Sequence, residues 1–157
     1  KKNRLFCIAC QNSAHQNEYG KLEPQDENCI AFPDPVQWNA WQRAQQSERI
    51  QRGQADFRAT VSELRVADKY RGGYRRCGRG ELVLQQAGLT FSGVIDGQDA
   101  EMFFPIAHVP AISTEFGFDF EICDATHAWW FFLLEAQQTI ILDTLISLYH
   151  EKCGAAL

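Results

Sequence analysis

The sequence contains no apolar run long enough to cross a lipid bilayer. Its longest such run, AWWFFLL at residues 128–134, is far shorter than the roughly 20 residues that a membrane-spanning helix needs. The opening residues, KKNRLFCIAC, also lack the longer apolar core of a secretory signal peptide. Because the chain does not begin with methionine either, we expect a segment of a longer cytoplasmic protein that could still lie, peripherally, at a membrane surface.

Basic residues are almost missing from the second half of the chain. Residues 80–157 hold only Lys152 against eleven Asp and Glu, whereas residues 1–79 hold the other fourteen Lys and Arg against nine acidic residues. A nucleic-acid-binding domain usually spreads positive charge over one face, so this asymmetry argues against nucleic acid as a partner. It favours a local surface that attracts anions.

Recognised catalytic motifs are missing as well. Residues 72–80, GGYRRCGRG, are rich in glycine, but they precede a predicted strand, whereas nucleotide-binding loops of this kind precede a helix. None of the serines lies in a nucleophile motif. His108 and His127 lie in apolar predicted strands, where a hydrogen-bonded structural histidine is the usual outcome. The sequence therefore assigns no catalytic residue to this chain.

Cysteine occurs six times, but the spacings do not form the paired framework of a small disulfide-rich domain, so we expect reduced thiols. Cys7 and Cys10 form a CxxC motif, which can present two thiolates to one edge of a zinc tetrahedron. His15 and Cys29 would complete a Cys3His set, and zinc is the one cofactor for which the sequence offers ligands. The alternative is a ribbon that has lost its metal and is stabilised by aromatic packing. The side chains available for that packing are Phe6, Tyr19 and Phe32.

The 157 residues are enough for one good core and a small satellite, and three segments are expected. Residues 1–33 are polar and rich in loop-forming residues, without sustained periodicity, and we expect an irregular, ribbon-like segment there. Residues 34–53 predict a connecting helix, because Asp34 is a good N-cap and Gly53 ends the pattern. Residues 54–157 predict a mainly β domain that ends in a helix.

The strands of residues 54–157 are predicted from alternation. FRATVSELRV changes its alternation near Ser62, which predicts a bulge or twist. ELVLQQ and LTFSGVI predict a hairpin that turns at Ala87–Gly88. About four more short strands are expected in AEMFFPIAHVPAIS, FGFDFEICDA and HAWWFFLLE. The last helix, over about 136–152, carries a wide apolar stripe that comprises Ile140, Ile141, Leu145, Leu148 and Tyr149.

The stretch HAWWFFLLE places adjacent aromatic residues on both faces of a strand. One interpretation is an exposed aromatic patch that docks on a membrane or on a catalytic domain. The favoured interpretation is packing, with one face in the core and the other beneath the helix of residues 35–52 or the N-terminal segment.

This order of elements resembles a pleckstrin-homology-like (PH-like) domain, a seven-stranded antiparallel barrel or sandwich capped by a C-terminal helix, with a long loop after the first strand. The stretch GRGELVLQQAGLTFSGVIDGQDAEMFFPIAHVPAI, with FDFEI, WWFFL and TIILDTLISLYHE after it, is similar to the C-terminal region of a bacterial group of 1-acyl-sn-glycerol-3-phosphate acyltransferase-like proteins. In that group a CxxC-containing, zinc-ribbon-like piece and an aromatic helix precede the PH-like domain. Here the CxxC of residues 7–10 and the helix in FPDPVQWNAWQ match those parts.

The catalytic signature of the acyltransferase family, HxxxxD, is absent from this chain. The residues five positions after its four histidines are Gly20, Ser113, Phe132 and Ala155. If the parent protein is an acyltransferase, its chemistry lies outside these residues.

The stretch KYRGGYRRCGRGE, residues 69–81, corresponds to the predicted loop after the first strand of the sheet. The resemblance implies that PH-like domains that bind inositol phosphates keep basic residues in this loop. Glycines let backbone N–H groups approach an anion, and arginines can bind phosphate oxygens bidentately. The candidates for binding an anion or a lipid are Lys69, Arg71, Arg75 and Arg76. The alternative is that these side chains are solvated or pair with acidic residues of the second half, such as Asp96, Asp99 or Glu101.

These features together predict a non-catalytic accessory module of a membrane-associated, acyltransferase-like protein. The expected partner is the catalytic domain of the same parent chain or another protein, and then an anionic membrane lipid. The alternative function is an independent enzyme, or part of a composite 1-acylglycerol-3-phosphate acyltransferase site.

Overall fold

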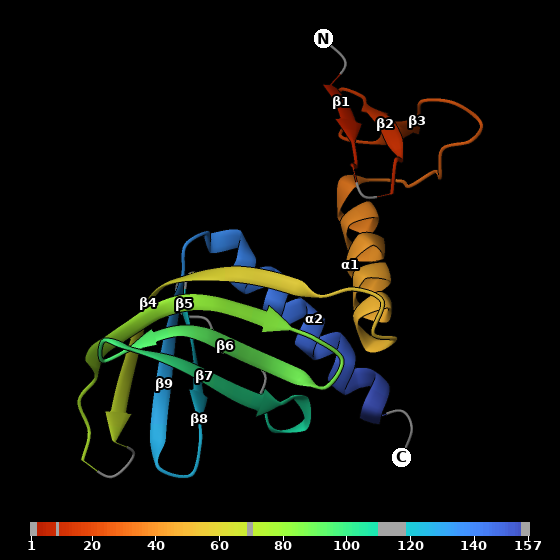
Figure 1. Cartoon of the computed structure of the whole chain (residues 1–157). Coiled ribbons are helices and arrows are strands. Elements are labelled where there is room, and N and C mark those ends of the chain that lie inside the picture. The colour runs from red at the N-terminus through yellow and green to blue at the C-terminus, as the bar shows by residue number, and fades with distance from the viewer. Residues whose placement is uncertain (1–2, 9, 69–70, 110–118, 155–157) are drawn as a thin grey trace. The chain divides into compact units, whose positions relative to one another are not determined.

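The computed structural model describes residues 3–8, 10–68, 71–109 and 119–154 of the chain. The fold is mainly β with two long helices, and the chain divides into two compact units, Lys1–Gln45 and Gln46–Leu157 (Figure 1). The division falls inside the first helix, α1 (Pro35–Gln51), whereas the sequence predicted three segments, 1–33, 34–53 and 54–157. None of the described helices is long and apolar enough to cross a membrane.

The first unit contains a small antiparallel sheet with the strand order β1-β2-β3. Its strands are β1 Asn3–Phe6, β2 Ser13–Gln16 and β3 Leu22–Pro24. The expectation of an irregular segment over residues 1–33 was therefore wrong. Strands of three or four residues are too short to show the alternation from which a strand is predicted.

Helix α1, Pro35–Gln51, begins and ends almost where the sequence predicted. The Asp34 carboxylate accepts a hydrogen bond of 2.9 Å from the backbone N–H of Gln37, as an N-cap does. In the first unit, Trp38 of this helix is buried and stacks on Phe32, with ring planes 5° apart. The helix thereby contributes Trp38 and, partly buried, Trp41 to the apolar cluster of the small sheet.

The second unit is built on a six-stranded antiparallel sheet with the order β7-β6-β5-β4-β9-β8 (Figure 1). Seven strands were predicted, and six form this sheet in the part of the chain that the structure describes. Between β7 and β8, a single turn of 3-10 helix, η1 Ile106–His108, follows Pro105. The strands are β4 Phe57–Asp68, β5 Arg75–Leu84, β6 Gly88–Ile95, β7 Gln98–Pro105, β8 Asp119–Cys123 and β9 His127–Leu133.

Strand β4 is the longest and has neighbours on both sides, β5 and β9. Its register with both neighbours shifts just after Val61, which confirms the bulge predicted near Ser62. A bulge bends its strand and increases the local twist. The bend lets one strand belong to both halves of a strongly curved sheet.

Strand β5 begins at Arg75, earlier than predicted, so the loop after β4 is short and the later basic residues lie in the strand. Gly78 and Gly80, which the sequence places in the predicted loop, belong to this strand. A Cβ at Gly78 would lie 2.2 Å from the backbone oxygen of Val94, and one at Gly80 would lie 2.3 Å from that of Ser92. These glycines therefore allow β5 to approach β6 closely, whereas Gly72 and Gly73, at φ +64 and +84, serve the turn.

Helix α2, Ala136–Gly154, runs along the sheet and closes the core of the second unit (Figure 1). The apolar residues of α2 that are almost fully buried are Leu142, Leu145 and Ile146. The predicted apolar stripe was wrong at Ile140, which is 58% exposed, and did not include Leu142. On the sheet side, the ring of Phe131 lies at the centre of the core, with Phe91, Phe104 and Phe120 within 6.1 Å of its centroid.

Candidate functional site

The basic segment after β4 divides into two parts. Arg71 lies exposed in the loop, while Arg75 and Arg76 are exposed at the start of β5. Lys69, the fourth candidate for anion binding, lies outside the described residues. The predicted candidates are therefore spread over a turn and a strand.

Arg75 forms a bidentate ion pair with Asp96, at the turn between β6 and β7. Its two terminal nitrogens lie 2.6 Å and 2.8 Å from the two carboxylate oxygens of Asp96. The hydrogen bond from Arg75 lowers the pKa of Asp96, and the same contact raises that of the guanidinium. Internal neutralisation of the basic segment, the predicted alternative, is thus observed at this residue.

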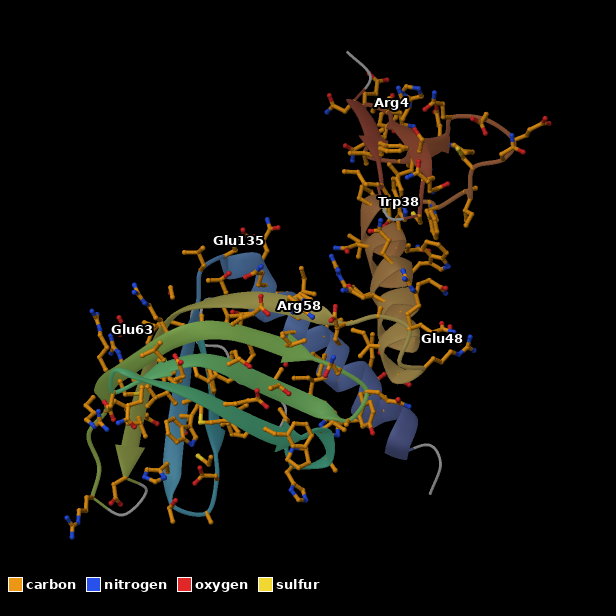
Figure 2. All side chains as sticks on the ribbon, in the orientation of Figure 1. Arg4, Trp38, Glu48, Arg58, Glu63 and Glu135 are labelled. Atoms are coloured by element: carbon orange, nitrogen blue, oxygen red, sulfur yellow. The ribbon has the colours of Figure 1, made fainter. Side chains whose placement is uncertain are left out.

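Arg76 is also paired, but on the outer face of the sheet. Both Arg76 and Arg65 contact the carboxylate of Glu63, which lies at the bulge of β4 and is labelled in Figure 2. The guanidinium of Arg65 also lies over two rings of β9, 5.3 Å from the centroid of Trp130 and 4.7 Å from that of Phe132. Arg76 therefore belongs to an ion-pair network with Glu63 and Arg65, separate from the pair of Arg75 and Asp96.

Three loops meet around a shallow depression of about 450 Å³ at one end of the second unit. They are the loop after β4, the β6–β7 turn and the β8–β9 turn; the first and the last lie at the same end of the sheet in Figure 1. The polar and glycine residues that line the depression are Asp68, Gly72, Gly73, Arg75, Asp96 and His127, and Trp129 forms part of its apolar wall. A guanidinium, an imidazole and a glycine turn suit a small anionic group, while the two aspartates oppose one.

The β8–β9 turn contributes residues that the sequence did not predict as part of a site. One oxygen of Asp124 accepts hydrogen bonds of 2.7 Å from the backbone N–H groups of Thr126 and His127, and the other accepts one of 2.7 Å from the indole N–H of Trp129. Partial burial raises the pKa of Asp124, but these hydrogen bonds outweigh that effect and lower it to about 2. The Asp-Ala-Thr-His sequence was a signal for this turn, yet nothing local indicated that the turn meets the loop after β4.

The packing interpretation of β9 is confirmed for the face in the core, whereas the contacts observed for the outer face among the described residues are not with the helix or the N-terminal segment that it named. Phe131 and Leu133 are buried in the core, and Trp130 and Phe132 lie half-buried on the opposite face. That outer face is covered by residues of the same unit, since Tyr74 packs edge-on against Trp130 and Arg65 lies over both rings. The Tyr74 hydroxyl donates to Glu121, and burial together with this carboxylate raises its pKa.

The predicted zinc ligands, Cys7, Cys10, His15 and Cys29, do not come together. Cys7 and Cys10 share a tight turn in which the Cys10 N–H lies 3.4 Å from the Cys7 sulfur. His15 lies within β2, opposite Arg4 and Glu23 on its neighbouring strands. Among the residues that the structure describes, no group of three or more His, Cys, Asp or Glu side chains is placed to hold a metal ion. The observed donor set thus does not fit the zinc that the resemblance implies.

Two buried polar residues, Asn12 and Ser13, connect the start of β2 to the chain on either side of the turn at residues 26–29. The Asn12 side chain donates to the backbone oxygen of Ile30 at 3.1 Å and accepts from its N–H at 2.7 Å. The Ser13 hydroxyl donates to the side-chain oxygen of Gln25, and the backbone N–H of Gln25 donates to the Ser13 carbonyl. These bonds bracket the turn that contains Cys29 from both sides.

Comparison with known proteins gives no match for this chain, whether with protein-family models, with curated proteins or with solved structures. A role for the protein must therefore be argued from its own geometry.

Proposed function

We propose that this chain is a non-catalytic interaction module that recognises an anionic group at the loop end of its second unit. The observation that carries the proposal is the convergence of Arg75, His127 and the Gly72–Gly73 turn on one depression. The exposed Arg71 lies beside this turn and adds positive charge. The phosphate of an anionic membrane lipid and the carboxylate of a protein partner share the chemistry that such a site would bind.

A PH-like fold for the second unit belongs to the same proposal. Its support is a four-stranded antiparallel meander, β4 to β7, a further strand pair that returns to β4, and a C-terminal helix that closes the core. The anion candidates follow the first strand of this arrangement. Fold alone does not determine function, so the binding must be measured.

A second proposal is that this chain belongs to an acyltransferase-like parent protein. Its support is the similarity of the sequence stretches alone. In that context the module would position a membrane-associated enzyme whose catalytic domain lies in the parent chain. The coding sequence upstream of residue 1 provides a direct test. An in-frame domain with an HxxxxD motif would support this context, and an upstream sequence without one would remove it.

Co-sedimentation with vesicles tests the anionic partner. We expect binding to vesicles of phosphatidylcholine with about 30% phosphatidylserine, weaker binding as salt rises, and none to phosphatidylcholine alone. The double variant Arg71→Gln/Arg75→Gln should bind about fivefold more weakly, because basic residues near an anionic surface each add affinity. The matched control is Arg52→Gln/Arg58→Gln, which removes two exposed, ion-paired arginines that do not line the depression.

Equal and negligible binding to both kinds of vesicle would exclude the lipid and leave the carboxylate of a protein partner. Equal losses in the two double variants would show that net charge, rather than this site, determines binding.

A further inference from the structure

We propose that Asp96 acts as a built-in competitor: its carboxylate occupies the guanidinium of Arg75 that an anionic partner needs, and it must be displaced before the partner binds. This inference rests on the proposed anion site and concerns its regulation. The basic segment was predicted either to bind an anion or to pair with acidic residues of the second half. Under this proposal Arg75 does both in turn.

The geometry of the pair is that of a bound oxyanion. Two parallel hydrogen bonds of 2.6 Å and 2.8 Å join the two guanidinium nitrogens to the two oxygens of Asp96. Bidentate pairing of this kind is also how arginine binds a phosphate or a foreign carboxylate. An incoming anion therefore competes with Asp96 for the same donors.

The pair is placed where an exchange of partners is possible. The side chains of Arg75 and Asp96 are 60% and 53% exposed, so solvent and ligands reach both. Exposed ion pairs contribute little to stability, and a partner with more charge can displace them. Arg76 differs, because the Glu63 carboxylate that it contacts is only 18% exposed and is also bound by Arg65.

The backbone fixes Asp96 in its position opposite Arg75. Asp96 has a positive φ of 51° and is followed by Gly97 at φ +82°, and its N–H donates to the carbonyl of Cys77 on β5 at 2.8 Å. Asn is favoured over other non-glycine residues at positive φ, and Asn-Gly is a preferred hairpin turn. Asp96→Asn therefore removes the competing charge and preserves the turn.

The test compares Asp96→Asn with Asp99→Asn, a variant that removes another exposed acid three residues later. Asp99 lies on β7, where no contact with Arg75 is observed among the described residues. Both variants change the net charge by the same amount. On vesicles of phosphatidylcholine with about 30% phosphatidylserine, Asp96→Asn should bind about two- to fivefold more tightly than Asp99→Asn, the range set by an exposed ion pair. The gain should vanish in Asp96→Asn/Arg75→Gln.

A second measurement uses inorganic phosphate and is independent of lipid. The NMR signal of the Arg75 side-chain Nε–H group should shift with added phosphate in Asp96→Asn at concentrations that leave the wild type unchanged. Circular dichroism and thermal unfolding of both variants establish that the fold is retained.

The outcomes separate the two proposals. Equal vesicle affinities of Asp96→Asn and Asp99→Asn, with the wild type bound, would overturn the competitor role and leave the anion site standing. If no variant binds vesicles but phosphate perturbs Arg75 only in Asp96→Asn, the competitor role stands and the lipid partner fails. If phosphate perturbs Arg75 in neither protein, or equally in both, the competitor role is overturned.

Discussion

At the residue scale, the carboxylate of Asp124 illustrates how a local turn determines an ionisation. Its pKa of about 2 lies below the ordinary value of 3.8, because the hydrogen bonds of the β8–β9 turn favour the charged form. Since the native pKa is the lower one, the stabilisation is present above about pH 4 and is lost as the pH falls toward 2.

We therefore expect the free energy of unfolding of the second unit to fall between about pH 4 and pH 2. The contribution of Asp124 is about 1 kcal/mol, once solvent screening of its 40% exposed side chain is taken into account. Chemical denaturation at several pH values measures it. Asp124→Asn should show a shallower decrease, and Asp99→Asn serves as an exposed control. Parallel pH profiles for Asp124→Asn and the wild type would contradict the assignment.

In the first unit, the side chain of Asn12 likewise holds a turn through hydrogen bonds to the backbone. Its substitution by Ala should destabilise the ribbon. The change leaves the N–H and carbonyl of Ile30 without the partners that they now have, at a cost of about 1–3 kcal/mol. Faster hydrogen exchange of the Ile30 amide would report this loss. Asn39→Ala, on the exposed surface of α1, is the matched control. Unchanged protection of the Ile30 amide would mean that the hydrogen bonds between Asn12 and Ile30 do not stabilise the ribbon.

At the scale of the element, strand β5 combines a basic start with a close approach to β6. Gly80 and Gly93 face each other across the two strands, so neither strand can carry a side chain there. A glycine pair of this kind places the strands where the curved sheet can close around its aromatic core.

Gly80→Ala should therefore destabilise the second unit. The added Cβ would lie 2.3 Å from a backbone oxygen of β6, and relieving such a contact costs about 1–3 kcal/mol or more. Gly72→Ala has open space around it and should cost only about 1 kcal/mol, from its positive φ. Thermal unfolding compares the two. A smaller effect at Gly80 than at Gly72 would contradict the close approach.

At the scale of the whole molecule, basic residues from the first half of the sequence form ion pairs with acidic residues from the second half. The basic segment from the first half lies beside the acidic β6–β7 turn from the second half, and Arg75 joins them. Among the described residues, Arg58 and Glu81 form a second ion pair between the two halves. Arg71, beside the Gly72–Gly73 turn, is exposed.

Metal removal is the test at this scale for the first unit. Because the four predicted ligands do not form a site, we expect less than about 0.2 equivalents of zinc in protein purified without added metal. Thermal unfolding with and without a chelator should coincide. One equivalent of zinc, or a lower midpoint with chelator, would show that the ribbon binds metal after all.

Local patterns were sufficient for much of the fold. Helix α1, the bulge of β4 and the mainly β class were predicted because caps, alternation and its interruption are properties of neighbouring residues. The short strands of the first unit and the early start of β5 were missed, because three-residue strands have no period and strand glycines resemble loop glycines.

Local sequence was enough to predict the two helices, the mainly β class and the place of the basic residues along the chain. Which charges meet depends on the strand pairing, because Arg75 at the start of β5 and Asp96 in the β6–β7 turn are 21 residues apart. The tertiary structure also decided that the β8–β9 turn with His127 and Trp129 belongs to the same depression. The physical reason is that strand pairing brings distant turns to one end of a sheet, and register, not local propensity, determines which side chains share that end.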